Sequence, residues 1–249
     1  MHRFCSLKMR IIKQNTKISE ALAKKFPHYH ADVASKYPKV VGSHSRPGSV
    51  IVDVGGGRSC AFVQQCNNSN IIAVDISAGE LALNQDVQDR RVGDVTKYIP
   101  VGDRSVDVVA SRFVAEHLRR TDLFIKEAYR VLRPGGFFIT LFPNKRAPFT
   151  VINRVLPKKV GLQIAYALKP TAKEIGVFPA FYHLCSPDQF RKACLASGFS
   201  NVKVEVDYFQ SSYFYFCLPL AAVSLCYEWM VSKLALEVLS SLVLVVATR

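Results

Sequence analysis

Acidic residues are scarce in this chain. Its 249 residues include 33 lysines and arginines but only 19 aspartates and glutamates, which gives a formal net charge of +14. No acidic residue occurs from Ala128 to Lys173, although lysine and arginine recur throughout that span. A charge of this sign predicts an anionic partner, which can be a substrate, a nucleic acid or a membrane surface.

The cysteines form no recognisable metal or disulfide pattern. The seven residues contain no C-x-x-C pair and no cysteine–histidine spacing typical of zinc, and their odd number argues against a complete set of disulfides. We therefore expect free thiols in a reducing, cytoplasmic compartment. The sequence also shows no carboxylate cluster that would predict a catalytic metal.

Targeting segments and linkers are also missing. Residues 1–17 are basic but lack the apolar core and cleavage site of a signal peptide, although their low acid content leaves a mitochondrial presequence open. No repeat or Gly/Ser-rich linker suggests a second domain. With 49% hydrophobic residues, the chain should form one domain, 1–249, with a large core.

The most informative segment is an apolar run that ends in three glycines. Residues 50–54, which include Asp53, read as a buried strand, and Gly55, Gly56 and Gly57 follow directly. Residues 60–63 are compatible with a helix. A strand, a glycine turn and a helix bring backbone N–H groups close to a ligand, so this segment predicts a nucleotide-type site.

A second apolar strand, residues 71–75, ends in Asp75, 22 residues after Asp53. The two strands and the segment between them predict a right-handed βαβ unit with both carboxylates at the carboxyl edge of a parallel sheet. Asp75 is then placed to accept hydrogen bonds from ribose hydroxyls. The alternative is a helix N-cap, a role that Ser77 can also fill.

The remaining pattern predicts further helices and strands. Residues 242–247 are apolar throughout and should be interior, whereas residues 202–206 alternate and should form an edge strand. Residues 133–136 predict a turn, and Ser186 should cap a helix that ends at Gly198. The other predicted helices are 18–26, 29–37, 78–88 and one through 123–132, and the other strands are 91–95, 106–110 and 137–142.

Two segments of the C-terminal half predict additions to a central domain. Residues 143–185 read as a basic, amphipathic lid, with a solvated basic face as the alternative. Residues 208–227 carry no charge, but a membrane crossing would separate the last strand from its sheet. We therefore predict an aromatic-rich insertion, 208–240, that lines an apolar pocket or meets a membrane interface, unless it simply packs on the domain.

These motifs resemble the class I S-adenosylmethionine-dependent methyltransferases, in particular the small-molecule "type 11" group. The matching strings are residues 53–57, Asp75, the turn 93–95 and the segment 130–136. The resemblance implies an α/β, Rossmann-like, seven-stranded mixed sheet of order 3-2-1-4-5-7-6 with helices on both faces. It also implies a helical cover over residues 1–49 and a cofactor-binding core over residues 50–142.

The same resemblance implies the cofactor contacts. The glycine turn would hold the methionine part, Asp75 the ribose, Asp94 the adenine amine and Val95 the adenine ring. Ser59 departs from the usual third glycine of the first motif. The full set of implied contacts is Asp53, Gly55, Gly56, Gly57, Asp75, Ile76, Asp94, Val95, Ser111 and Arg112.

Other nucleotide-binding classes fit less well. A dehydrogenase fingerprint that begins at Gly55 requires glycine at position 60, where Cys60 stands, and no Gly-Lys-Ser/Thr follows the glycines.

Methyl transfer needs in-line positioning of donor and acceptor, helped by a base where the acceptor is a hydroxyl. His117 is the first candidate for that base, with a surface or core histidine as the alternative. Glu116 could orient His117 or bind the cofactor's amino group, and Tyr182 and His183 are candidate substrate contacts.

The sequence therefore predicts a methyltransferase, a transferase of EC class 2.1.1, that acts on a small or lipid-like acceptor, most simply by O-methylation. We expect a cytoplasmic or peripheral membrane protein that contacts an anionic surface. One alternative is a nucleic-acid (RNA) methyltransferase, although no Asn/Asp-Pro-Pro-Tyr/Phe motif is present. The other is a non-catalytic cofactor-binding protein on the same fold.

Overall fold

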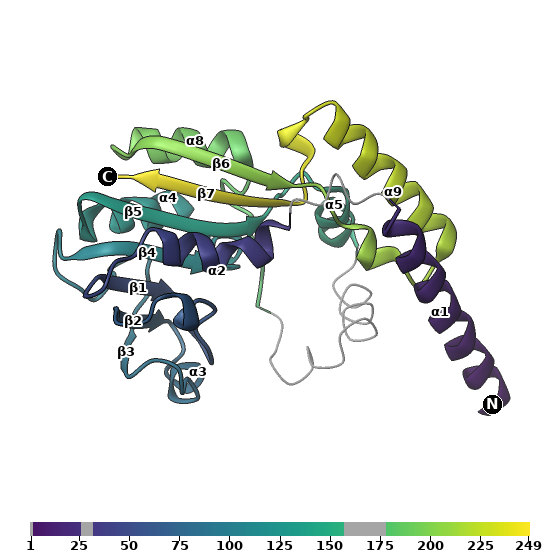
Figure 1. The fold of residues 1–249 in the computed structure, drawn as a ribbon, viewed down its shortest axis with the longest axis horizontal. Coiled ribbons are helices and arrows are strands. Elements are labelled where there is room, and N and C mark those ends of the chain that lie inside the picture. Colours follow the sequence, from purple (N-terminus) through teal and green to yellow (C-terminus); the bar gives the residue numbers. More distant parts are fainter. Residues whose placement is uncertain (1, 26–31, 157–177) are drawn as a thin grey trace. The chain divides into compact units, whose positions relative to one another are not determined.

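The structure is a computed structural model that describes residues 2–25, 32–156 and 178–249. The chain forms two compact units (Figure 1). The sheet unit comprises Val33–Lys145, Phe178–Glu205 and Leu242–Arg249, and the helical unit comprises Met1–Asp32, Arg146–Val177 and Val206–Ser241. Residues 157–177 of the predicted lid, 143–185, lie outside the described residues.

The sheet has seven strands in the order β3-β2-β1-β4-β5-β7-β6, as predicted. Strands β1, β2, β3, β4 and β5 pair in parallel, and β7 pairs antiparallel with β5. The strands are β1 (Val50–Val54), β2 (Asn70–Asp75), β3 (Asp89–Val92), β4 (Val106–Arg112), β5 (Leu132–Pro143), β6 (Ser200–Asp207) and β7 (Leu242–Thr248).

The register brings the ends of three strands together. Val54 lies opposite Val74 of β2 on one side and Ser111 of β4 on the other. Because these parallel strands end at the same edge, the residues that follow them meet at one place. The predicted cofactor motifs therefore converge at the carboxyl edge of the sheet.

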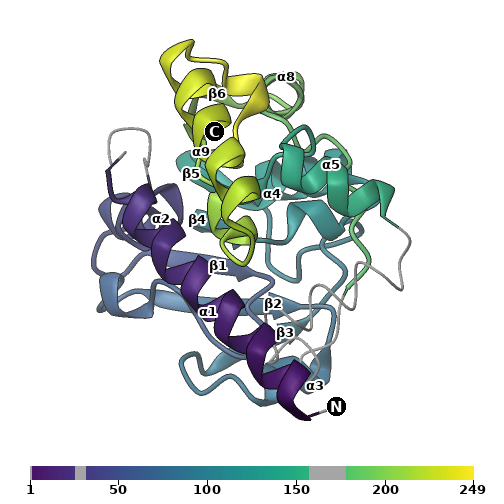
Figure 2. The same cartoon turned by 90° about the vertical axis from the view of Figure 1, so that its right-hand side faces the viewer.

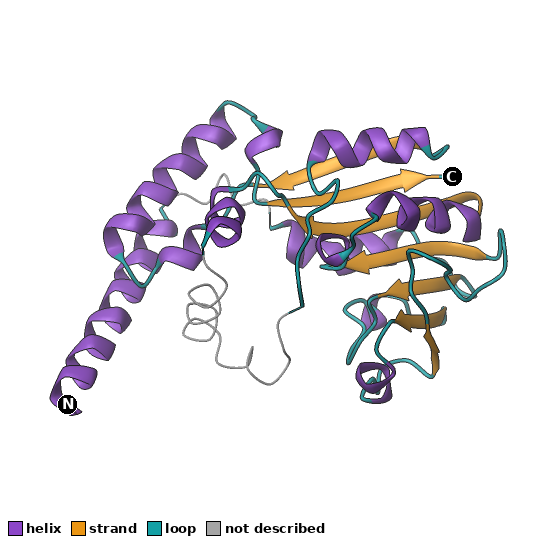
Figure 3. Ribbon diagram, turned by 180° about the vertical axis from the view of Figure 1, so that it is seen from behind, coloured by secondary structure: helices purple, strands orange, loops and turns teal. Residues whose placement is uncertain are grey.

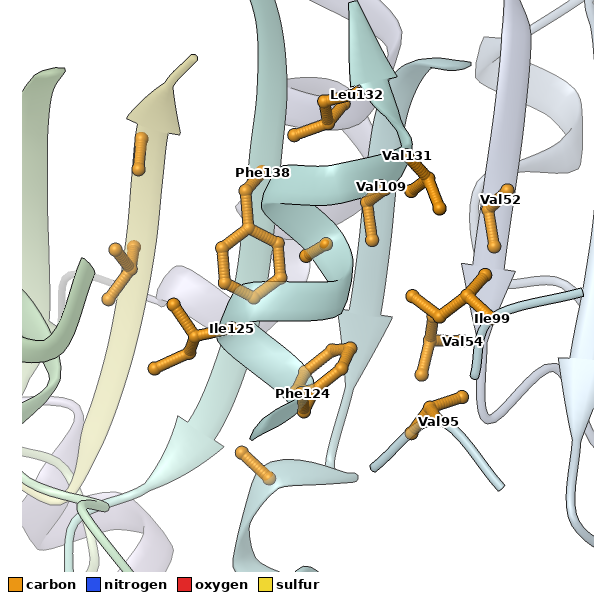
Figure 4. Close-up of a cluster of buried hydrophobic side chains, with 14 of the residues drawn as sticks. Val52, Val54, Val95, Ile99, Val109, Phe124, Ile125, Val131, Leu132 and Phe138 are labelled. Atoms are coloured by element: carbon orange, nitrogen blue, oxygen red, sulfur yellow. The ribbon is translucent and has the colours of Figure 1, made fainter. Parts of the chain in front are cut away.

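Helices cover both faces of the sheet, as predicted. Helix α2 (Val33–Ser43) packs on one face, and α4 (Thr121–Val131) and α8 (Pro187–Ala196) pack on the other (Figures 1 and 3). Figure 4 shows how side chains of α4, such as Phe124 and Ile125, meet strand residues such as Phe138. All three of these side chains are fully buried, so their burial contributes on the order of 2 kcal/mol each.

The helix predicted after the glycine turn is absent. Residues 58–62 form turns and irregular structure, and only the 3-10 helix η2 (Val63–Gln65) follows. The N–H of Cys60 donates to the Asp86 carboxylate at 2.9 Å rather than joining a helix. The predicted helix 78–88 is also shorter, because α3 (Ala78–Ala82) gives way to a turn in which Asn84 accepts from the N–H groups of Asp86 and Val87.

Other local features also differ from the prediction. Helix α1 begins at His2 rather than residue 18, and Pro38 lies inside α2 rather than after it. The predicted turn 133–136 is an irregularity within β5, where the register passes from Val106↔Leu132 to Val108↔Phe137. Ser186 precedes α8 as predicted, but its side chain makes no capping hydrogen bond.

The helical unit contains α1 (His2–Ala23), α5 (Pro148–Val155), η4 (Ser211–Phe214), α9 (Leu218–Lys233) and η5 (Glu237–Leu239). Helix α1 packs against α9 and the segment before it (Figure 2). The buried Glu228 accepts hydrogen bonds from the Gln210 N–H and from the hydroxyls of Ser211 and Ser224, which explains an acid inside this unit. Among the described helices, none has the length and hydropathy needed to span a bilayer.

Candidate active site

A cavity of about 410 Å³ opens at the carboxyl edge of the sheet, within the sheet unit. It lies where β1, β2 and β4 end, and the predicted cofactor motifs form much of its wall. Its lining includes Val54, Gly55, Gly57, Val74, Asp75, Ile76, Glu80, Gly93, Asp94, Val95, Arg112, Phe113, Val114, His117, Leu118, Phe178, Pro179 and Phe181.

The glycines of the turn 55–57 allow neighbouring elements to approach the backbone closely, but their N–H groups are already used in hydrogen bonds within the protein. The N–H groups of Gly55 and Gly56 donate to the Val74 carbonyl at 2.8 and 3.3 Å, and that of Gly57 donates to Asp75. Our expectation of bare N–H groups at this turn is therefore wrong. A Cβ on Gly55 would lie 2.2 Å from Val114 Cγ2, and one on Gly56 would lie 2.8 Å from Ala73 Cβ. The glycines are needed because neighbouring elements approach them too closely for a side chain.

Asp75 connects the turn to the cavity. Its Oδ2 accepts from the Gly57 N–H at 3.2 Å, and its Oδ1 accepts from the Ser77 N–H at 2.8 Å. Ser77, rather than Asp75, caps α3 through its bond with the Glu80 N–H. Each carboxylate oxygen has further acceptor capacity, so Asp75 can bind a diol while it stabilises the turn.

Asp94 is fixed at the next strand end. Its Oδ1 accepts from the Thr96 hydroxyl at 2.6 Å and from the Thr96 N–H at 3.0 Å. These bonds, with the Thr96 hydroxyl first, lower the pKa of Asp94, so the group stays ionised. Val95 supplies an apolar surface beside it, a pairing suited to the amine and the ring of adenine.

Three predicted contacts lie behind the wall rather than in it. Gly56 faces Ala73, and the Ser111 hydroxyl bonds to the Thr140 hydroxyl at 2.7 Å. Asp53 is 6% exposed, and burial, with a smaller contribution from the Asp75 charge, raises its pKa to about 7. These residues support the turn and the strand ends, and direct cofactor contacts from them stay a prediction.

Residues 178–183 complete the cavity from a distant part of the sequence. They dock on η3 (Ala115–His117), where the Glu116 carbonyl accepts from the N–H groups of Phe181 and Tyr182 at 2.7 and 3.0 Å. This docking brings Phe178 and Phe181 into the wall. Aromatic faces of this kind attract cations such as the sulfonium of S-adenosylmethionine.

His117 lies in the cavity wall with its ring orientation fixed. Its Nδ1 is 3.0 Å from the Pro179 carbonyl oxygen. Because a carbonyl only accepts, this contact requires the proton on Nδ1, and Nε2 is then an acceptor in the neutral ring. His117 thus lies beside the predicted cofactor motifs, and its role as a general base stays a prediction.

Glu116 is a buried acid beside this histidine. The residue is 5% exposed, its Oε1 lies 3.9 Å from His117 Nε2, and its Oε2 has no hydrogen-bond partner within the described ranges. Burial raises the pKa of Glu116 to about 7. An unsatisfied, buried acid costs stability and is more common at functional sites than in structural positions.

Tyr182 and His183 do not line the cavity. The Thr121 hydroxyl donates to the His183 carbonyl at 2.7 Å, and the Thr121 N–H donates to His183 Nδ1 at 3.1 Å. The role of Tyr182 and His183 in substrate binding stays a prediction. The sequence did not predict that Phe178 and Phe181 of the same segment line the cavity, and the aromatic content of the segment was its only signal for a pocket wall. Within the described residues, no group of three or more His, Cys, Asp or Glu side chains could hold a metal.

This sheet order, with a glycine turn and strand-end acids around one cavity, is that of the class I S-adenosylmethionine-dependent methyltransferases. The methyltransferase domain family matches residues 52–140 of the chain. S-Adenosylmethionine is the cofactor that this match indicates, and contacts of Gly55, Asp75 and Asp94 with its methionine, ribose and adenine parts stay a prediction.

Known proteins similar to this chain differ in their acceptors. A ubiquinone/menaquinone biosynthesis C-methyltransferase of Rubrivivax gelatinosus is 33% identical over 99 residues, or 38% of this chain and 39% of that protein. A malonyl-acyl-carrier-protein O-methyltransferase of Yersinia pestis is 35% identical over 97 residues, or 37% of this chain and 36% of that protein. The chain thus spans less than half the length of these curated relatives.

A solved structure extends the likeness in fold. Geranyl diphosphate C-methyltransferase of Streptomyces coelicolor, determined with S-adenosylhomocysteine, matches with a TM-score of 0.55 and 16% identity, over 87% of this chain and 79% of that chain. At this identity the comparison shows the shared fold alone.

We expect Glu116→Gln to stabilise the protein at pH 8 but not at pH 5. The folded protein holds the Glu116 pKa near 7, above that of an unfolded chain, so it favours the protonated carboxyl. Stability from this group is present below the unfolded pKa and is lost as pH rises through 7. Glutamine imitates the protonated form, so the gain at pH 8 should be about 1–3 kcal/mol, as measured by urea unfolding.

Glu80→Gln is the matched control for this change. Glu80 is a carboxylate of the same cavity, and its pKa is lowered by the hydrogen bond from Arg58. Its replacement should give no gain at pH 8. A Glu116→Gln variant whose stability follows the wild type at both pH values would show that Glu116 is charged without penalty.

Proposed function

We propose that this protein transfers the methyl group of S-adenosylmethionine to a small or lipid-like acceptor, with a hydroxyl as the expected methylated group. The observation that carries the proposal is the single cavity that joins the cofactor motifs to His117 and to the aromatic residues 178 and 181. Methyl transfer requires the donor and acceptor in line and water excluded, which a largely apolar wall supports.

His117 would act as the base for a hydroxyl acceptor. Its Nδ1 contact with Pro179 leaves Nε2 able to take the proton as the oxygen attacks the methyl group. S-Adenosylmethionine would supply the activated methyl group, and S-adenosylhomocysteine would be the product. The relatives named above methylate carbon or oxygen, so the acceptor atom is part of the proposal. A cytoplasmic location is proposed with it, supported by the free state of the six cysteines whose side chains the structure describes.

The first test is calorimetric titration with S-adenosylmethionine, S-adenosylhomocysteine and NAD, followed by transfer of a labelled methyl group to phenols, lipids and RNA. We expect binding of both sulfur compounds and not of NAD, and labelling of phenols or lipids. Binding without transfer to any acceptor would favour a non-catalytic role, and labelling of RNA alone would favour the nucleic-acid alternative.

Asp75→Ala tests the ribose assignment within the same experiment. Hydrogen bonds to a charged group contribute about 1.5–3 kcal/mol, so affinity should fall about tenfold to a hundredfold. The matched control is Asp89→Ala, which removes a strand carboxylate paired with Arg91 at 2.7 Å outside the cavity. Unchanged affinity in a folded Asp75→Ala protein would remove the ribose role.

A further inference from the structure

Exposed apolar side chains are concentrated in the helical unit. In the sheet unit, several of the large exposed hydrophobic residues have a role, because Ile76, Phe113, Phe178 and Phe181 line the cofactor cavity. Most of the others in the described residues belong to α1, α5 and the segment from η4 to η5. A concentration of this kind marks a site of interaction.

Helix α9 is apolar on its exposed face as well as its buried face. One side packs into the unit through Ala221, Leu225 and Val231, which are at most 2% exposed. A surface helix of a soluble domain normally carries charges on its other side. Here Lys233 is the only charged residue among the exposed positions of α9, all of which the structure describes. The large exposed apolar residues of α9 are Leu220 at 48%, Val223 at 69%, Trp229 at 45% and Met230 at 48%, and Leu234 at 62% follows directly after the helix.

Helix α1 supplies positive charge to the same unit. It is held through Asn15, whose amide donates to the Phe216 carbonyl at 3.1 Å, and through the buried Ser19. Arg10, Lys13 and Lys17 are exposed and recur at the three- and four-residue spacing of one helix face. Lys24 and Lys25 continue the charge after the helix, and Glu20 is the single exposed acid among residues 10–25.

We propose that the exposed face of α9 and the basic face of α1 form a docking surface for an anionic lipid bilayer. Apolar side chains would enter the headgroup and acyl boundary, and lysine and arginine would contact acidic headgroups. Trp229 fits this interface because its ring combines an apolar body with a polar N–H group. This inference rests on the proposed function. If the acceptor is lipid-like, an enzyme docked on the membrane can take the acceptor directly from the bilayer.

Charge favours a bilayer over a second copy of the chain. Two copies that meet through this surface would bring their α1 basic faces close together, which costs free energy at low dielectric. An anionic membrane supplies the opposite charge across the whole surface, at about 1 kcal/mol for each lysine or arginine near it. No spanning helix is required for such binding.

Vesicle flotation tests the proposal with the full chain. The wild type should float with vesicles of mixed phosphatidylcholine and phosphatidylglycerol, and more weakly with phosphatidylcholine alone. The double variant Val223→Asn, Leu234→Asn should lower partitioning on both about tenfold or more. The double variant Lys13→Glu, Lys17→Glu should lower it by a similar factor on the anionic vesicles only.

Leu195→Asn and Lys192→Glu are matched controls, because both are exposed on α8 in the sheet unit. They should float as the wild type does, and S-adenosylhomocysteine binding checks the folding of every variant. Failure of the wild type to float, or equal flotation of all variants, would overturn the proposal. So would a dimer that the α9 variant converts to monomer without a change in flotation. Methyl transfer to a water-soluble acceptor tests the proposed function independently of membrane docking, because such an acceptor does not have to be taken from a bilayer.

Discussion

Gly55→Ala is expected to lower the affinity for S-adenosylmethionine at least a hundredfold. Gly55 has φ +75°, and its added Cβ would lie 2.2 Å from Val114 Cγ2. The left-handed backbone alone costs alanine about 1–2 kcal/mol. The clash adds more, since Val114 directly precedes η3 and must move with it or push the glycine turn aside. Either movement displaces two walls of the cofactor cavity.

Gly48→Ala separates the clash from the backbone cost. Gly48 has φ +84°, but a Cβ there would have nothing within 4 Å. Both variants should lose a similar amount of stability from the backbone, as measured by thermal unfolding. Calorimetry with S-adenosylhomocysteine should then show lost affinity for Gly55→Ala alone. Affinity within a few-fold of wild type in Gly55→Ala would mean that the turn does not shape the cofactor site.

The sheet could be predicted because its signals are local. An apolar run such as residues 50–54 is buried on both faces in any parallel sheet, and the position of each strand end follows from its last apolar residue. Asp75 and Asp94 therefore lie where the sequence placed them, next to the cavity. The alternating residues 202–206 likewise lie in the predicted edge strand.

The errors arose where distant groups compete for the backbone. Asp86 takes the N–H of Cys60, and the Asn84 amide donates to the Gly56 carbonyl at 2.7 Å, so neither segment continues as the predicted helix. No local pattern reports such pairings. The same reason explains why residues 178 and 181 were missed, because their place in the wall depends on hydrogen bonds to the carbonyl of Glu116.

The burial of Glu116 was also beyond the sequence. A glutamate before a histidine on a short turn is usually solvated. Here the docking of residues 178–183 on η3 and the packing of Cys185 nearby leave it 5% exposed. The sequence indicated a possible pair with His117, but only the fold shows that the acid is buried and that the histidine faces the cofactor cavity.

His117→Gln should reduce turnover of a hydroxyl acceptor by about a hundredfold to ten-thousandfold, the usual contribution of a general base. Glutamine keeps a polar side chain but cannot take the proton of the acceptor. The affinity for S-adenosylhomocysteine should stay near that of the wild type, because a base acts on the acceptor rather than on the cofactor. The measurement is the initial rate with a labelled methyl donor and the best phenol acceptor.

Cofactor affinity distinguishes a base from a residue that only supports the cavity wall. A structural loss lowers the rate and weakens S-adenosylhomocysteine binding in parallel. The matched control is His44→Gln, since His44 bonds to the Val40 carbonyl at 2.8 Å and lies against Phe137 away from the cavity. It should keep the wild-type rate. If His117→Gln turns over at the wild-type rate, the proton goes elsewhere, and Glu116 becomes the next candidate, because it is the other titratable group on the same turn.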